Sequence, residues 1–189
     1  MDNEITIAYV GLGSNLGDRA GNLLLAVRGL MEASFVVHKL SGIYETEPVG
    51  VKGHGSFLNM AAEIHLSNIT PSQMMARMLR IEYLLGRKHK SLAKPRTVDL
   101  DLLLFGNYQC DTEFLTIPHP KLHLRRFVLT PMSEIAPHVV HPVLQKDMQE
   151  LLKITDDNSN VHRWNPNTEM ESEPHDAKVF LNSLVQETQ

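Results

Sequence analysis

The chain has 189 residues, of which 42% are hydrophobic, and a formal net charge of −4. This length and composition predict one domain of ordinary size with its own core, and they exclude a membrane span, because no stretch approaches about 20 consecutive apolar residues. Cys110 is the single cysteine, which excludes an intrachain disulfide, and the N-terminal residues lack the basic and apolar regions of a signal peptide, which favours a cytoplasmic protein.

The acidic balance lies toward the C-terminal end. Residues 155–189 hold seven acidic and two basic residues, a net charge of −5, which leaves residues 1–154 at about +1. A nearly neutral body argues against nucleic acid as a partner. We predict a domain over residues 1–154 and a polar acidic extension over residues 155–189, which could be partly disordered.

The predicted elements follow the order β-α-β-β-α-β. Strands are expected over residues 4–10, 34–46, 57–66 and from 97 onward. Helices are expected after a turn over residues 11–18, between Thr70 and Gly86, and over residues 126–135 and 147–154. This order is typical of the ferredoxin-like plan. We therefore predict an α+β fold, a ferredoxin-like α/β sandwich with a mostly antiparallel central sheet flanked by helices.

Two acidic residues interrupt the apolar run that begins at Thr97. Alternate residues of a strand face the same way, so Asp99 and Asp101 would project side by side from one face. The opposite face is expected to be core and comprises Val98, Leu100, Leu102 and Leu104. Neighbouring carboxylates on an apolar strand are costly unless a cation neutralises them, and Mg²⁺ prefers carboxylate oxygens together with substrate phosphates. The alternative is a solvated face with two ordinary acids.

A cluster of basic side chains precedes this strand. It consists of Arg77, Arg80, Arg87, Lys88, Lys90, Lys94 and Arg96. Such a run is usually a solvated face, but cations beside paired carboxylates also indicate a site where metal ions and basic side chains share the charge of a polyphosphate.

The glycines of the first turn match no nucleotide-binding motif. Their spacing is Gly-x-Gly-x-x-x-Gly, one residue off the dinucleotide fingerprint, and no Gly-Lys-Ser/Thr follows them. We expect a glycine turn that lets the first strand and helix pack closely.

Two other stretches could contact a ligand. His119 lies between prolines that restrain its backbone, with Arg125 a few residues further on, and such a set suits contact with phosphate. Phe57 and Asn59 share a strand face, where the ring could stack on a flat heterocycle and the amide could bind its edge. The alternatives are a structural histidine and a core phenylalanine.

In their order along the chain, these motifs resemble the 6-hydroxymethyl-7,8-dihydropterin pyrophosphokinase family over about residues 4–152. The matching pieces are Gly13-Ser14-Asn15-Leu16-Gly17, Tyr44-x-Thr46-x-Pro48-x-Gly50, Phe57-Leu58-Asn59, Ile81-Glu82 with Gly86-Arg87, Pro95-Arg96-Thr97-x-Asp99-Leu100-Asp101, Pro118-His119-Pro120 with Arg125 and Phe127, Glu134-Ile135-Ala136-Pro137 and His141-Pro142. The resemblance implies an ATP-dependent diphosphokinase of folate biosynthesis. It would transfer the pyrophosphoryl group of ATP to the hydroxymethyl oxygen of the pterin, giving AMP and the pterin diphosphate.

The resemblance also implies a role for particular residues. Asp99 and Asp101 would hold two Mg²⁺ ions that bridge the ATP phosphates, and Arg87 and Arg96 would complete the catalytic set. The residues expected to contact ATP are Glu82, Arg87, Arg96, Thr116, His119 and Arg125. Those expected to contact the pterin are Thr46, Val49, Phe57, Asn59, Asp99 and Phe127, with the two phenylalanines on either side of the ring. ATP and the pterin are the expected partners of a monomer that binds neither nucleic acid nor membrane.

Two other interpretations stay open at this point. A different two-metal nucleotidyl or phosphoryl transferase could use a Gly-Ser turn and an Asp-x-Asp pair, although Ser14 and Asp99 are far apart for that fold. A non-catalytic ferredoxin-like binding module, such as an RNA binder, would need stacking aromatics and a basic surface, whereas only 6% of the residues are aromatic.

Overall fold

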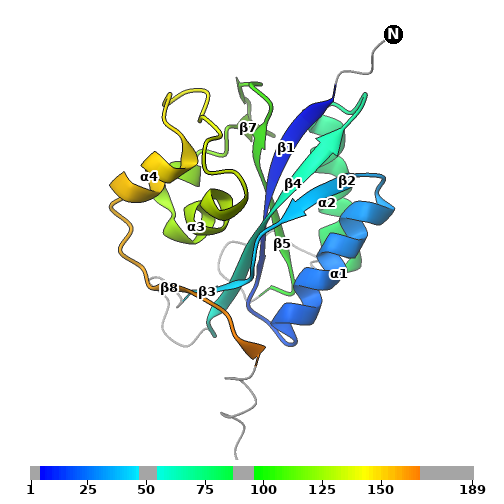
Figure 1. Ribbon diagram of the computed structural model, residues 1–189. Coiled ribbons are helices and arrows are strands. Elements are labelled where there is room, and N and C mark those ends of the chain that lie inside the picture. The colour runs from blue at the N-terminus through cyan, green and yellow to red at the C-terminus, as the bar shows by residue number, and fades with distance from the viewer. Residues whose placement is uncertain (1–4, 47–54, 87–95, 167–189) are drawn as a thin grey trace, which may run out of the picture.

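The computed structural model describes residues 5–46, 55–86 and 96–166, in which one main sheet separates two groups of helices (Figure 1). The strands are β1 (Thr6–Ser14), β2 (Val36–Leu40), β3 (Tyr44–Thr46), β4 (Phe57–Leu66), β5 (Asp99–Phe105), β6 (Cys110–Asp111), β7 (Thr116–Ile117) and β8 (Val161–Arg163). The helices are α1 (Arg19–Glu32), α2 (Pro71–Leu84), α3 (Arg126–Ile135) and α4 (Met148–Ile154), with a short 3₁₀ turn at Leu122–Leu124. No described helix is both long and apolar enough to cross a membrane.

The main sheet has the strand order β5-β1-β4-β3-β8, and β2 pairs with β4 alongside β3. Every pairing in it is antiparallel. Helices α1 and α2 cover one face and α3 and α4 lie on the other (Figure 1). The antiparallel sheet and its flanking helices confirm the predicted fold class.

The period-2 pattern of β1 divides the core into two layers. Ala8, Val10 and Leu12 are buried in the cluster shared with α1 and α2, whereas Tyr9 belongs to the cluster beneath α3 and α4. Alternate side chains of a strand point to opposite faces, so the next two residues on the Tyr9 face are glycines, Gly11 and Gly13. Beyond Tyr9, β1 therefore adds only glycines to this face of the sheet, and the site described below lies there.

The first strand is longer than the sequence predicts. Gly11 and Gly13 do not form a turn but continue β1, where they pair with Ala61 and Asn59 of β4. They pair with Asp101 and Asp99 of β5 on the other side. Hydrogen-bonded partners on both sides outweigh the low strand propensity of glycine, so the expectation of a turn over residues 11–14 was wrong.

The long strand expected over residues 34–46 is two strands, because the chain breaks at Ser41. The backbone N–H of Ser41 donates to the carbonyl of Ala61, and its hydroxyl accepts from the Ala61 N–H, at 2.9 Å each. The pairing with β4 resumes at Tyr44 with its register changed by one residue. The side-chain oxygen thus takes the place of one backbone partner, a competition that Ser commonly offers to regular structure.

The face predicted for one residue of β5 is also wrong, although that residue, Leu104, is buried as expected. The register between β1 and β5 shifts between Tyr9 and Val10, which pair with Leu104 and Leu102. The extra residue, Leu103, turns Leu104 to the side of α3 and α4, whereas Leu100 and Leu102 stay on the predicted face. A one-residue shift exchanges faces because side chains alternate along a strand.

The helix signals near residue 70 perform as expected. The Thr70 side chain accepts from the backbone N–H of Gln73, and the Gln73 side chain accepts from the Thr70 N–H, which completes a capping box around Pro71. By contrast, α3 has no cap from its own N-cap residue, Arg125. The carboxylate of Asp157 accepts from the Arg126 N–H at 2.7 Å instead, so a residue beyond position 154 caps this helix.

Residues 155–166 are packed against the domain. β8 pairs with β3 at the edge of the sheet, and the backbone N–H of Trp164 donates to the carbonyl of Ile43 at 2.9 Å. The Trp164 side chain packs against the core. The first third of the predicted extension therefore completes the sheet.

Candidate active site

The two aspartates of β5 face the bare strip on β1. Asp99 pairs with Gly13 and Asp101 with Gly11, and both carboxylates line one cavity of about 740 Å³. A Cβ at Gly13 would lie 3.2 Å from the Oδ1 atom of Asn59 and 4.0 Å from the Cβ of Asp99. Glycine at this position leaves the floor of the cavity flat and brings an amide oxygen and a carboxylate to either side of it.

The structure brings together most of the residues predicted for the site. The members of the predicted set that line this cavity are Thr46, Phe57, Asn59, Arg96, Asp99, Asp101, His119, Arg125 and Phe127. They come from β3, β4 and β5 or their ends, from the segment that follows β7, and from the start of α3, so residues far apart in sequence converge on one face of the sheet. The main additions that the sequence did not indicate are Gly11, Gly13, Lys121, Leu124, Pro131 and Asp157.

Arg96 is held at the edge of the cavity by both its backbone and its guanidinium group. Its N–H donates to the Asn15 side chain at 2.8 Å, and its carbonyl accepts from the Asn15 N–H at 3.2 Å. Its guanidinium forms an ion pair with the Asp99 carboxylate. The ion pair places one of the predicted basic side chains beside one of the predicted carboxylates.

The two phenylalanines predicted to stack on a ring both line the cavity and come from different elements. Phe57 opens β4, whereas Phe127 lies in the first turn of α3, with the Arg125 guanidinium 5.5 Å from the centre of its ring. Asn59 is buried, and its amide donates to the Thr46 hydroxyl at 3.2 Å. This bond uses the NH₂ group, so the amide oxygen is the atom turned toward Gly13 and the cavity floor.

His119 stands between two cavities. Its backbone N–H donates to the Leu103 carbonyl at 2.9 Å, and its Nδ1 accepts from the Lys121 N–H at 3.1 Å. Burial lowers the pKa of the imidazole, the Asp101 charge opposes that shift, and the Arg125 charge adds to it. The side chain is thus favoured as a neutral imidazole whose proton is on Nε2.

Thr116 lies in the neighbouring cavity of about 400 Å³, which shares His119 with the first. Its hydroxyl donates to the Asp111 carboxylate at 2.9 Å. Thr116 and the two aspartates thus line different cavities, and His119 lines both.

Among the predicted site residues that the structure describes, Glu82 alone lines neither cavity. Glu82 is buried on α2, and its Oε1 accepts from the Leu100 N–H at 2.8 Å. Glu82 therefore provides the hydrogen-bond acceptor for the one backbone N–H of β5 that lies between the two aspartates. Val49 and Arg87 lie outside the described residues, and the contacts expected of them stay predictions.

The second cavity contains a histidine that should make stability depend on pH. His141 is 4% exposed, and its Nδ1 accepts from the Val143 and Leu144 N–H groups at 3.3 and 3.2 Å. Burial, and then the nearby His123, lower the pKa of His141 below the usual 6.5. A proton on Nδ1 would break both bonds, so the neutral form is the native one.

We expect stability to be full above pH 6.5 and to fall as the pH drops through the lowered pKa, because the unfolded chain then binds the proton more readily than the native chain. Thermal unfolding measured between about pH 7 and pH 5 checks this. His141→Asn keeps an acceptor without the titration, so its curve should be flatter in this range. An equal acid slope in both proteins would contradict the assignment.

The sequence is similar to known proteins of one family. Residues 9–137 match the family model of 7,8-dihydro-6-hydroxymethylpterin-pyrophosphokinase. The chain is 46% identical over 134 residues to the 2-amino-4-hydroxy-6-hydroxymethyldihydropteridine pyrophosphokinase of Bacillus subtilis, covering 70% of this chain and 80% of the relative. It is 36% identical over 142 residues to the enzyme of the same name from Aquifex aeolicus, covering 75% of this chain and 88% of the relative.

A solved structure gives an independent comparison of the fold. A Plasmodium falciparum HPPK-DHPS chain superposes with a TM-score of 0.64 at 16% identity, covering 80% of this chain and 46% of the solved one. The match at such low identity speaks for the fold alone. The matched family model and the two bacterial relatives show that this chain belongs to the 7,8-dihydro-6-hydroxymethylpterin pyrophosphokinases.

Proposed function

We propose that the protein transfers the pyrophosphoryl group of ATP to the hydroxymethyl oxygen of 6-hydroxymethyl-7,8-dihydropterin, with the aspartate pair as the reaction centre. As a member of this family the chain is an ATP-dependent pyrophosphokinase of folate biosynthesis. The observation that carries the proposal is the single cavity that joins Asp99 and Asp101 to Asn59 and the two phenylalanines. A polyphosphate-metal site and a slot for a flat ring are the two halves that this reaction needs.

The pterin half of the site is formed by Phe57, Phe127, Asn59 and Thr46. The phenylalanines would stack on the two faces of the ring. The Asn59 oxygen, oriented by the bond to Thr46, would accept from the N–H groups on the edge of the pterin. Val49 belongs to this half by resemblance and would contribute its backbone.

The phosphate half is formed around Asp99 and Asp101. Two carboxylates at alternate positions of one strand, in a cavity that the paired glycines also line, suit Mg²⁺, which favours oxygen ligands and retains water and phosphate oxygens. We propose that they hold two Mg²⁺ ions. When bound, Mg²⁺ would neutralise the phosphate charge that develops during transfer.

The chain's own residues would align the reacting atoms. Asp99 lies beside Asn59 across Gly13, so it is the aspartate nearer the pterin and the one suited to contact the hydroxymethyl group. The hydroxyl oxygen forms a bond to the β-phosphorus, the bond from that phosphorus to the oxygen shared with the α-phosphorus breaks, and AMP leaves. The hydroxyl proton passes to the Asp99 carboxylate or to water.

Cations and a neutral imidazole would bind ATP in the phosphate half. Arg96 and Arg125 would neutralise phosphate oxygens, and Nε2 of His119 would donate to one of them. Thr116, in the adjoining cavity, would contact the nucleotide on the far side of His119. Arg87 and Glu82 complete the proposed ATP set, with Glu82 acting through the strand backbone that it supports.

We further propose that residues 1–154 carry the catalytic domain and residues 155–189 form an acidic extension of a monomeric cytoplasmic enzyme. The packing of residues 155–166 gives this extension one part in the site, because Asp157 both caps α3 and lines the main cavity. The expected partners are the two substrates alone.

The experiment that tests the function is an assay of the nucleotide product. The full chain with MgATP and 6-hydroxymethyl-7,8-dihydropterin should form AMP and pterin diphosphate in equal amounts. An ordinary kinase would form ADP, and a nucleotidyltransferase would release pyrophosphate, so either product in place of AMP would overturn the proposal. An ATP analogue with a methylene group between the α- and β-phosphorus should bind and inhibit without reacting, because the bond that must break is then blocked.

A further inference from the structure

A second cluster of ligating side chains lies on the same face of the sheet, beyond the catalytic cavity. Glu63 and His65 are alternate residues of β4 and share a face, which is also the face of Asn59. Neither Glu63, His65 nor their neighbour His38 lines either cavity. Glu63 is four positions from Asn59 along the strand, a distance of about 13 Å.

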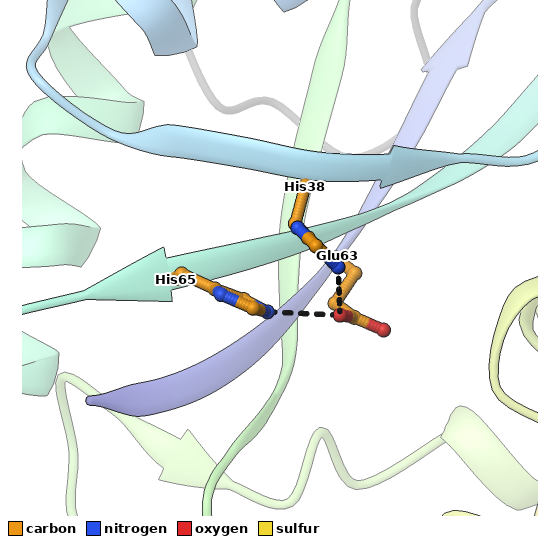
Figure 2. A group of neighbouring side chains, drawn as sticks. All are labelled: His38, Glu63 and His65. Carbon is orange, nitrogen blue, oxygen red and sulfur yellow. Dashed lines mark hydrogen bonds and ion pairs between the residues drawn. The ribbon is translucent and has the colours of Figure 1, made fainter.

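A register shift brings His38 to this pair. In the antiparallel pairing of β2 with β4, Val37 pairs with Ile64 and Lys39 with Glu63, so His38 is the extra residue between them. Such a bulge re-aims a side chain, and here two consecutive residues of β2 reach one carboxylate. Figure 2 shows His38 descending from β2 toward Glu63, with His65 approaching from β4.

The three side chains converge on one oxygen. Oε1 of Glu63 lies 2.9 Å from Nε2 of His65 and 3.9 Å from Nε2 of His38 (Figure 2). These three atoms all lie within 4.8 Å of one another. The two imidazoles are stacked, with ring centroids 4.1 Å apart and planes inclined by 21°, and the Nε2 atoms of both face the same carboxylate oxygen.

The other oxygen of Glu63 is used by different residues. Oε2 accepts from the Lys39 ammonium and from the Tyr9 hydroxyl, at 3.2 Å each. Burial by itself would raise the pKa of Glu63, but the bonds from His65, Lys39 and Tyr9 hold it below its usual range. The carboxylate is therefore ionised and fixed in orientation by partners outside the cluster, as in carboxylates that bind metals.

We propose that His38, Glu63 and His65 form a binding site for one divalent transition-metal ion of the Zn²⁺ type. Two imidazole nitrogens and one carboxylate oxygen are a ligand set that suits Zn²⁺ and leaves a fourth position for water. Mg²⁺ prefers oxygen ligands and would stay at the aspartates, so the two sites divide the metals by ligand chemistry. The side chain of His38 is 49% exposed, which leaves a path for the ion from solvent.

Lys39 gives the proposal a distinguishing prediction. Its ammonium sits on the same carboxylate as the proposed ion, so the two positive charges repel across a few ångströms. Replacing Lys39 with an uncharged side chain of similar length should strengthen metal binding. If the histidines and Lys39 served only to neutralise the Glu63 charge, the same replacement would not strengthen metal binding.

The test is a calorimetric titration of the full chain with ZnCl₂ in excess Mg²⁺, which occupies the aspartates. We expect one equivalent of Zn²⁺ to bind with micromolar affinity and EDTA to reverse it. His38→Gln and His65→Gln should each weaken binding about tenfold or more, and Lys39→Met should strengthen it several-fold. Shifted ¹⁵N signals of the two Nε2 atoms should accompany the titration.

His138→Gln is the matched control. His138 also pairs with a carboxylate, with Nδ1 3.5 Å from an Asp147 oxygen, but it has no second imidazole in that pair. Its replacement should leave the affinity unchanged. Zinc binding that is equal in wild type, His38→Gln and His65→Gln, or that weakens in Lys39→Met, would overturn the proposed site. Because His38 is half-exposed, His38→Gln should fold, which a melting curve verifies.

Discussion

Replacing Asp99 and Asp101 together by asparagine is expected to lower kcat for AMP formation by about 10³-fold or more. Both carboxylates line the cavity from one face of β5, and no other acid that lines it comes from this strand. Asparagine keeps the shape but loses the charge that would hold Mg²⁺ against the ATP phosphates. Initial rates of AMP formation at saturating substrates measure the effect.

Loss of fold would give the same result, so stability is the necessary control. Removing two neighbouring negative charges relieves their repulsion, although Arg96 loses its ion pair with Asp99. Because that pair is part-exposed, we expect a change in melting temperature of only a few degrees. Pterin should still bind the double variant. AMP formation near the wild-type rate in this variant would contradict the role assigned to the pair.

Replacing Asn59 by alanine is expected to raise KM for the pterin by about 100-fold while leaving KM for ATP nearly unchanged. The amide oxygen faces the cavity floor next to Gly13, and its NH₂ group is held by Thr46. Without it, the polar edge of the ring would be buried with no partner, which costs about 1–3 kcal/mol for each unpaired group. Steady-state kinetics with each substrate varied in turn separate the two constants.

Thr46→Val provides the graded control for this prediction. It leaves the Asn59 amide in place but removes the oxygen that orients it, so a smaller increase in pterin KM should result. Thr46 is buried, and valine has nearly the same volume, so the replacement should leave no large cavity. An Asn59→Ala enzyme whose two KM values rise equally would contradict a specific role at the ring and point to a general distortion of the cavity.

The edge between the catalytic domain and its extension is less sharp than the charge distribution indicates. Asp157 is one of the acidic residues that make residues 155–189 negative, yet its carboxylate caps α3 and lines the main cavity. Helix α3 carries Phe127, so its N-terminal cap helps to hold one wall of the proposed pterin slot. Charge along a sequence does not show which acidic side chain the fold places against a helix terminus and a cavity.

The sequence by itself determined the main helices and the residue types that meet in the cavity. The capping signals at Thr70, the apolar periods and the Asp-x-Asp alternation are local patterns, and local patterns depend on residues only a few positions apart. The order of the motifs along the chain is likewise a property of the sequence alone. For these reasons the sequence alone predicts the fold class, the helix at residues 126–135 and the side-by-side aspartates.

Only the tertiary structure decided what depends on pairing between distant segments. Gly11 and Gly13 became the floor of the site because β4 and β5 flank them, and Leu104 changed faces because of a single extra residue opposite β1. The same physics joined His38 to Glu63 through a register shift. Register is set by the free energy of whole strands packed together, and a shift of one residue reverses every side chain beyond it, so no local pattern around these residues could have specified the outcome.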